Sequence, residues 1–189
     1  NKSLKNMVTF SSDLSFTKSN YFTPRLKIIM PLKINNTDKI NNEDSNSITF
    51  NYQNQFSENR FFGNDLFDSS PRFVYGLESV LNKDNQKFSF KINQSYETNL
   101  NSNYSNKINQ FSKFSDYAIE AEINNDIALF RIDSRLNQKN LSKKEMNYSI
   151  ELDKPINMSL RYNETQSGAF KNHSEDTQSI IFGISKSLN

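Results

Sequence analysis

Hydrophobic and polar residues alternate along most of this chain, the period-two pattern of a β-strand with two unlike faces. In segment 117–124, Glu120 and Glu122 fall between apolar residues that share the opposite face: Tyr117, Ile119, Ala121 and Ile123. The same alternation returns at 146–152 and 156–162, and helical spacing fits none of these stretches. The pattern predicts nine strands, at residues 8–17, 21–34, 72–81, 87–96, 116–124, 127–136, 144–152, 156–164 and 178–188.

The lengths of these strands and of their connections indicate a membrane barrel. Most strands approach the roughly 9–11 residues that cross a bilayer at a tilt, whereas strands of soluble proteins average about five or six. Short connections alternate with longer ones along the whole chain: 18–20, 35–71, 82–86, 97–115, 125–126, 137–143, 153–155 and 165–177. An up-and-down barrel has tight turns on one rim and extended loops on the other. We therefore predict an all-β fold, an antiparallel up-and-down transmembrane β-barrel.

The number of strands indicates a sector of a barrel rather than a closed one. Nine strands are too few for a wide barrel, and an open sheet leaves two unpaired edges. The chain also begins at Asn1 without an initiator methionine. We therefore expect residues 1–189 to be an open fragment of a larger barrel domain.

The placement of charges fits such a barrel. A charged side chain facing lipid at the midplane costs roughly 2–4 kcal/mol, and in the clearest strands every charge falls on the non-apolar phase. Strand 127–136 is less clean, because Leu129 shares the charged phase and Ser134 the apolar one. The residues that we predict to line a wet lumen are Glu120, Glu122, Arg131, Asp133, Glu151 and Arg161. A soluble β-sandwich would produce the same alternation and stays an alternative.

Composition excludes several other classes of protein. Only 34% of the residues are hydrophobic, but aromatic residues make up 13%, which argues against disorder. The net charge of +2 is dispersed, so no basic stripe marks a nucleic-acid-binding protein. Cysteine is absent, which removes disulfides, thiolate catalysis and cysteine-based metal sites. No apolar run approaches the roughly 20 residues of a membrane helix.

The candidate chemistry is sparse. Glu120 and Glu122 could form a glycosidase-type carboxylate pair, but a polar lumen lining explains them more simply because nothing else marks a cleft. The single histidine, His173, lies in a polar loop and is expected to be solvated. We therefore predict no catalytic residue, no metal site and no cofactor, and we expect that the protein is not an enzyme.

Four motifs around the longest connection carry a resemblance. They are, in order, Phe22-Thr-Pro-Arg-Leu-Lys-Ile-Ile-Met-Pro31, Ile40-Asn-Asn-Glu-Asp-Ser45, Asn59-Arg-Phe-Phe-Gly-Asn-Asp65 and Arg72-Phe-Val-Tyr-Gly-Leu77. This succession resembles the barrel domain of the LptD family of lipopolysaccharide-assembly proteins, also called organic solvent tolerance proteins. Ser115-Asp116-Tyr117, which opens a strand after a long loop, is a further likeness. The motifs occupy residues 22–81, and the strand rhythm extends the likeness over most of the chain.

The resemblance implies a component of the translocon that transports lipopolysaccharide to the surface of a Gram-negative outer membrane. Its implied partners are lipopolysaccharide, a plug lipoprotein similar to LptE, and periplasmic bridge components. The saccharide would pass through the lumen, and the acyl chains would leave through a gate between the first and last strands. Relative to the family, the jelly-roll domain, the final barrel strands and hence the gate are expected to lie outside this chain.

The motif at 59–65 permits two interpretations. Asn59, Arg60, Phe61, Gly63 and Asp65 either contact lipopolysaccharide or hold the loop in shape. We favour loop architecture, with Gly63 supplying an unusual backbone angle and Arg60 and Asp65 satisfying buried polar groups. Two other functions stay open for the chain as a whole, a generic porin or channel and a non-membrane β-rich surface protein.

Overall fold

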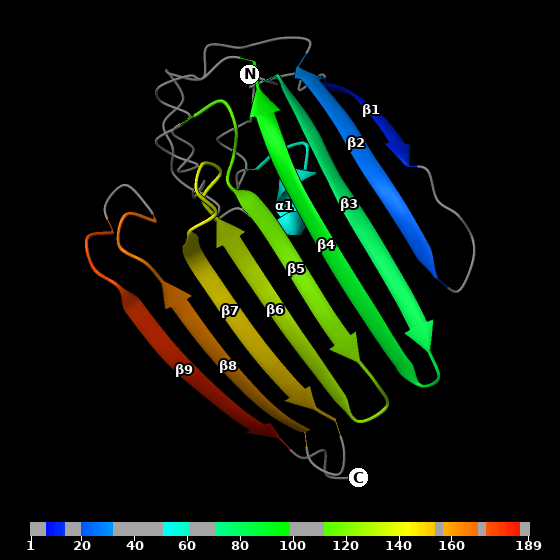
Figure 1. Ribbon diagram of the computed structural model, residues 1–189, viewed down its shortest axis with the longest axis vertical. Helices are drawn as coiled ribbons and strands as arrows, with labels where there is room; N and C mark the ends of the chain where they lie inside the picture. Colours follow the sequence, from blue (N-terminus) through cyan, green and yellow to red (C-terminus); the bar gives the residue numbers. More distant parts are fainter. Residues whose placement is uncertain are drawn as a thin grey trace, which may run out of the picture.

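The described residues form one sheet of nine antiparallel strands in chain order (Figure 1). The computed structural model describes residues 7–13, 20–31, 51–60, 71–98, 112–153, 157–169 and 173–185, with the backbone alone for 7–13 and 31. The strands are β1 (Met7–Asp13), β2 (Tyr21–Pro31), β3 (Arg72–Lys83), β4 (Gln86–Glu97), β5 (Tyr117–Asn124), β6 (Ala128–Leu136), β7 (Lys143–Leu152), β8 (Asn157–Thr165) and β9 (Thr177–Ser185). The predicted all-β, up-and-down architecture is therefore confirmed.

The observed strands agree with the nine predicted ones to within a few residues at the described ends. The predicted ends at 14–17, 32–34 and 186–188 lie outside the described residues. Segment 35–71, predicted as a loop throughout, contains a one-turn helix, α1 (Tyr52–Gln55). Period-two alternation carries no signal for such a helix, and a helix this short is unstable alone. Local capping by Asn51 and Asn54 and the contacts described below hold it.

The two ends of the sheet differ as the connection lengths predicted. In Figure 1, β3, β5 and β7 end at the lower end of the sheet, where the described turns 84–85 and 125–127 are short, whereas the longer described connection 137–142 lies at the upper end. Asp84 allows the tightest turn with a positive φ of 54°, a conformation that Asp and Asn tolerate better than most residues. Asn125 closes the next turn, because its side-chain oxygen accepts from the amides of Ile127 and Ala128.

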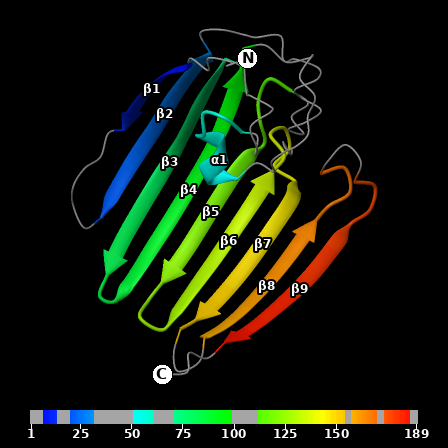
Figure 2. The ribbon, with the colours of Figure 1, turned by 180° about the vertical axis from the view of Figure 1, so that it is seen from behind.

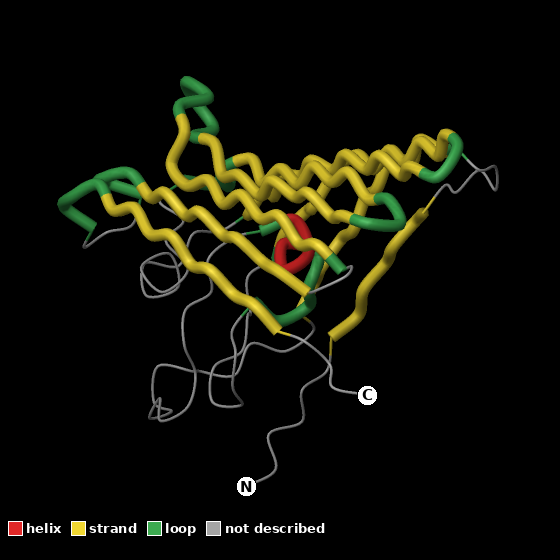
Figure 3. The backbone as a smooth tube through the Cα atoms, turned by 90° about the horizontal axis from the view of Figure 1, so that it is seen from below, coloured by secondary structure: helices red, strands yellow, loops and turns green. Residues whose placement is uncertain are grey.

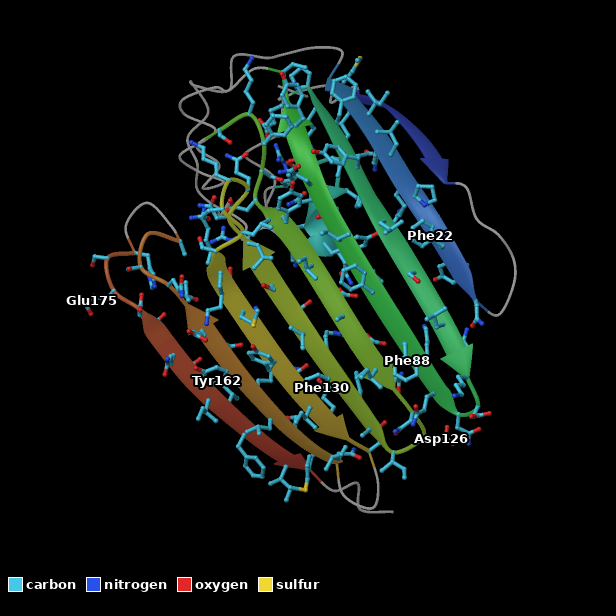
Figure 4. The ribbon with its side chains drawn as sticks, viewed as in Figure 1. Phe22, Phe88, Asp126, Phe130, Tyr162 and Glu175 are labelled. Carbon is cyan, nitrogen blue, oxygen red and sulfur yellow. The ribbon has the colours of Figure 1, made fainter. Side chains whose placement is uncertain are left out.

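The sheet is curved, and α1 lies against its concave face (Figures 2 and 3). The convex face carries the apolar phase of the strands, and its large side chains are open to the surroundings. Phe22 is 59% exposed, Leu81 53% and Phe182 60%. The concave face carries the polar phase. Figure 4 looks onto the convex face, where Phe22, Phe88, Phe130 and Tyr162 are labelled.

The distribution of burial is inverted relative to a soluble globular domain. The largest fully buried side chains are those of Arg60, Arg72 and Arg135, and arginine is rarely fully buried in soluble domains. Four of the seven described buried apolar residues form a small cluster where α1 and Phe56 meet β2 and β3: Ile29, Tyr52, Phe56 and Val74. Within the described part of the chain, no helix is long and apolar enough to cross a membrane.

Candidate functional site: the polar concave face

Strand register brings the predicted lumen-facing residues onto one surface. Lys91 on β4 faces Glu120 on β5, which faces Asp133 on β6, and Glu122 faces Arg131 in the next row. The same phase continues through Glu151 on β7 and Arg161 on β8. All six residues therefore lie on the concave face: Glu120, Glu122, Arg131, Asp133, Glu151 and Arg161.

Ion pairs between neighbouring strands cross this surface. Lys91 Nζ lies 2.6 Å from Glu120 Oε1, and Arg131 Nη2 lies 2.8 Å from Glu122 Oε2. The pairs arise because opposite charges directly across an antiparallel ladder are within side-chain reach. The two carboxylates first considered as a glycosidase pair thus each engage a different cation. This arrangement is a ladder of paired charges, and it offers hydrogen-bond donors and acceptors at low net charge.

A third pair continues the ladder across β7 and β8, in a more open setting. Arg161 Nη2 lies 3.2 Å from Glu151 Oε1, and the two side chains are 56% and 37% exposed. By contrast, the side chains of Lys91 and Glu120 are 20% and 8% exposed. The concave face therefore becomes more open to solvent from β4 toward β8.

A cavity of about 330 Å³ opens on the concave face between the start of α1 and strands β5 to β7. Its polar lining brings together residues from the loop and from three strands: Asn51, Gln53, Glu120, Arg131, Asp133, Arg135, Glu145 and Asn147. At its upper edge Arg135 is almost fully buried, with Nε 3.8 Å from Glu145 Oε2 and 4.0 Å from Asp116 Oδ2. Arg135 Nη2 also donates to the carbonyl of Ala169. The cavity is thus suited to a hydroxyl-rich or amide-rich ligand.

The segment 51–60, which we call the inner segment, docks onto this face through α1. Asn93 Nδ2 on β4 donates to the Tyr52 carbonyl at 2.6 Å, and Arg25 Nη1 donates to the Tyr52 hydroxyl at 3.5 Å. Burial raises the pKa of the Tyr52 hydroxyl above its usual value. Gln55 completes the contact, because its Nε2 donates to the Asp116 carbonyl. These bonds attach α1 to β2, β4 and the start of β5.

The end of the inner segment is held by a buried ion pair. Arg60 Nη2 lies 2.6 Å from Glu97 Oε1, and both side chains are completely inaccessible to solvent. Arg72 Nη2 donates to the carbonyls of Ser57 and Glu58, which fixes the chain just before Arg60. The Asn59 carbonyl accepts from Ser57 Oγ at 2.7 Å. Of the motif residues, Asn59 and Arg60 are therefore placed within the fold.

The other motif residues, Phe61, Gly63 and Asp65, lie outside the described residues. Sequence reasoning did not identify Glu97 as a member of the site, because it lies one residue beyond the predicted strand 87–96. Arg135 shares the charged phase of Arg131 and Asp133, but that phase gives its face and not its partners. Arg72 is the first residue of one of the four motifs, which was a weak indication that it belongs to the site. Among the described residues, no group of three or more His, Cys, Asp or Glu side chains is arranged to hold a metal ion.

Comparison with known proteins identifies the family. Residues 3–187 match the family model LptD, described as LPS transport system D. None of the curated proteins compared matches the chain. The match covers nearly the whole chain and agrees with the open antiparallel sheet, its apolar convex face and its polar concave face. The chain therefore belongs to the LptD family, a family of outer-membrane proteins of lipopolysaccharide transport.

Proposed function

We propose that this chain forms part of the wall of an outer-membrane translocon that transports lipopolysaccharide and inserts it at the cell surface of a Gram-negative bacterium. One observation carries the proposal: in a chain of the LptD family, the convex face is apolar and exposed while the concave face is polar. Such a wall separates lipid outside from a hydrated passage inside. A non-membrane surface protein would leave the convex face without a function.

The concave face suits the saccharide part of lipopolysaccharide. Sugar hydroxyls exchange hydrogen bonds with water for hydrogen bonds with charged and amide side chains at little net cost. The paired charges of Lys91 with Glu120 and Arg131 with Glu122 avoid a strong net field. The saccharide passes along this ladder, and the acyl chains leave the barrel sideways.

In this proposal the motif residue Arg60 anchors the inner segment rather than contacting lipopolysaccharide. Its complete burial against Glu97 supports the anchoring role. Replacing Arg60 by Ala in the full-length protein separates the two roles. Failed barrel assembly supports anchoring, whereas normal assembly with defective lipopolysaccharide export supports direct contact.

The partners of the proposed translocon are lipopolysaccharide, a plug lipoprotein similar to LptE and periplasmic bridge components. Membership of a lipopolysaccharide transport family supports the first of these. The other two follow from the resemblance of the motifs alone. Co-purification of the full-length protein with a lipoprotein of this kind tests the second partner directly. We propose no catalytic step and no cofactor.

Site-specific photocrosslinking in the full-length protein tests the function. A photoreactive residue at Asn147, on the concave face, is expected to crosslink lipopolysaccharide only while export is running. The matched position Ile150, on the convex face of the same strand, is expected to show no export-dependent crosslink. A folded barrel that gives no crosslink at Asn147, yet lets small sugars pass in reconstituted vesicles, would instead indicate a generic channel.

A further inference from the structure

The convex face is hollowed near the tight-turn end of β3 to β6. The hollow has a volume of about 280 Å³. Its walls and floor are almost entirely apolar and include Ser79, Leu81, Phe88, Phe90, Ala121 and Phe130. Phe88 and Phe130 are visible on the lower half of the sheet in Figure 4. We call this hollow the outer groove.

The register of four strands explains the outer groove. One row across the convex face reads Ser79, Phe90, Ala121 and Ile132, so that small and large side chains alternate. The adjacent row, closer to the turns, contains only large side chains: Leu81, Phe88, Ile123 and Phe130. The two small residues, Ser79 and Ala121, therefore leave depressions beside the larger aromatic side chains.

A cation lies at the turn end of the groove. Lys83 is exposed, and its position on β3 points to the same convex face as Leu81. It lies two residues beyond Leu81, which is about 7 Å along the strand. Among the residues of β3, β4, β5 and β6 whose side chains point to the convex face, Lys83 is the one charged residue. Of the acids at this rim, Asp84 lies in the turn itself, and Asp126 accepts from Asn85 Nδ2 at 2.8 Å.

A lipid bilayer determines what fills such a groove. Another acyl chain is as apolar as the groove, so area burial alone gives no preference for one occupant over its neighbours. An unfilled hollow, however, forfeits dispersion contacts along its lining, and a flexible methylene chain can follow it. Selectivity then comes from the headgroup, because a negatively charged phosphate is attracted to a nearby lysine.

We propose that the outer groove binds one acyl chain of a phospholipid whose phosphate pairs with Lys83. The tight turns of outer-membrane barrels face the periplasm, so this lipid belongs to the inner leaflet, where phospholipid is the available anionic lipid. The site goes beyond the proposed transport function, since it requires only that the barrel lies in the membrane. It would fix one sector of the wall against the bilayer.

The test uses the full-length protein in lipid nanodiscs that contain phosphatidylglycerol with a photoreactive group in its acyl chain. After irradiation and digestion, peptides from 79–90 and 121–132 are expected to carry most of the label. Lys83→Gln is expected to reduce that label about fivefold, the effect of one lysine at an anionic headgroup. Ala121→Phe fills the groove and is expected to bring the label down to the level found on β7 to β9.

Two matched variants control the experiment. Leu160→Phe places the same aromatic side chain on the convex face of β8, and Lys139→Gln removes an exposed lysine at the opposite rim. Neither is expected to change the label on 79–90 and 121–132. If Ala121→Phe does not fold, Ala121→Leu and Lys83→Gln still decide the matter. Label spread evenly over the convex face of the wild type, or unchanged in Lys83→Gln, would overturn the proposal.

Discussion

The two halves of the concave face differ in what covers them. Over β2 to β5 the inner segment lies against the sheet, and residues such as Asn93, Ser95 and Glu97 on β4 are almost completely buried. Over β8 and β9 no described residue is buried, and the ion pair of Glu151 with Arg161 is half exposed. One sheet with a continuous ladder thus has a covered half and an open half.

This difference teaches how a sheet with lipid on one face is stabilised on the other. The apolar residues of the strands are used on the convex face, so the covered half has few apolar residues for packing against the inner segment. It relies instead on buried polar groups, and buried charges are tolerable only when they are paired and hydrogen-bonded. The open half needs no such network, because solvent satisfies its polar groups. Substitutions in the covered half should therefore cost more than equivalent ones in the open half.

The largest effect is expected for the buried ion pair of the covered half. Glu97→Ala leaves Arg60 buried without this carboxylate, and breaking a buried pair in this way costs about 3–5 kcal/mol. Urea unfolding of the full-length barrel in detergent, followed by its heat-modifiable migration, measures the loss. Glu151→Ala in the open half is the control and should cost less than about 1 kcal/mol. Equal unfolding midpoints for the two variants would contradict the comparison.

The next effect concerns the two faces of the open half. Leu160→Arg on β8 places a charge on the convex face, which costs roughly 2–4 kcal/mol near the bilayer midplane. Ser159→Arg, one residue earlier, points to the concave face opposite Gly183 and should be tolerated. The assembled fraction of each variant in outer-membrane preparations measures the difference. A tolerated Leu160→Arg would show that lipid does not contact this face.

A smaller effect is expected within the inner segment. Asn51 and Asn54 form a capping box, in which each side chain accepts from the amide of the other residue. Asn51→Ala removes one of these bonds and should destabilise α1 by about 1 kcal/mol. Hydrogen exchange at 52–56 should then accelerate while exchange in β3 and β4 stays slow. Gln53→Ala, on the same helix but outside the capping box, provides the control and should leave exchange unchanged.

The smallest effect separates exposed from covered ion pairs. A double-mutant cycle on Glu151 and Arg161 should give a coupling free energy of about 0.2–1 kcal/mol. The same cycle on Lys91 and Glu120, whose carboxylate is almost buried, should give a larger value because solvent screens it less. A coupling for Glu151 and Arg161 that equals or exceeds the other would remove the distinction between the two halves.

The strand pattern was predictable from the sequence because its cause is local. A side chain on a strand points to one face or the other according to its parity, so Tyr117, Glu120 and Arg131 reveal their faces without any knowledge of partners. The lengths of the connections could be predicted from the sequence in the same way, and they indicated that the two rims differ. The motif block around 59–65 indicated the family. Parity could not indicate α1, which depends on a cap and on contacts with distant strands.

What the sequence by itself determined is therefore the alternation of the strands, the polarity of the two faces and the order of the connections. Only the tertiary structure decided which charges meet. Arg60 and Glu97 are 37 positions apart and pair because the inner segment folds back onto β4. The outer groove likewise depends on Ser79 and Ala121 flanking Phe90 in one row. Both arise from register and loop packing between segments distant in sequence, which the parity of a single strand does not encode.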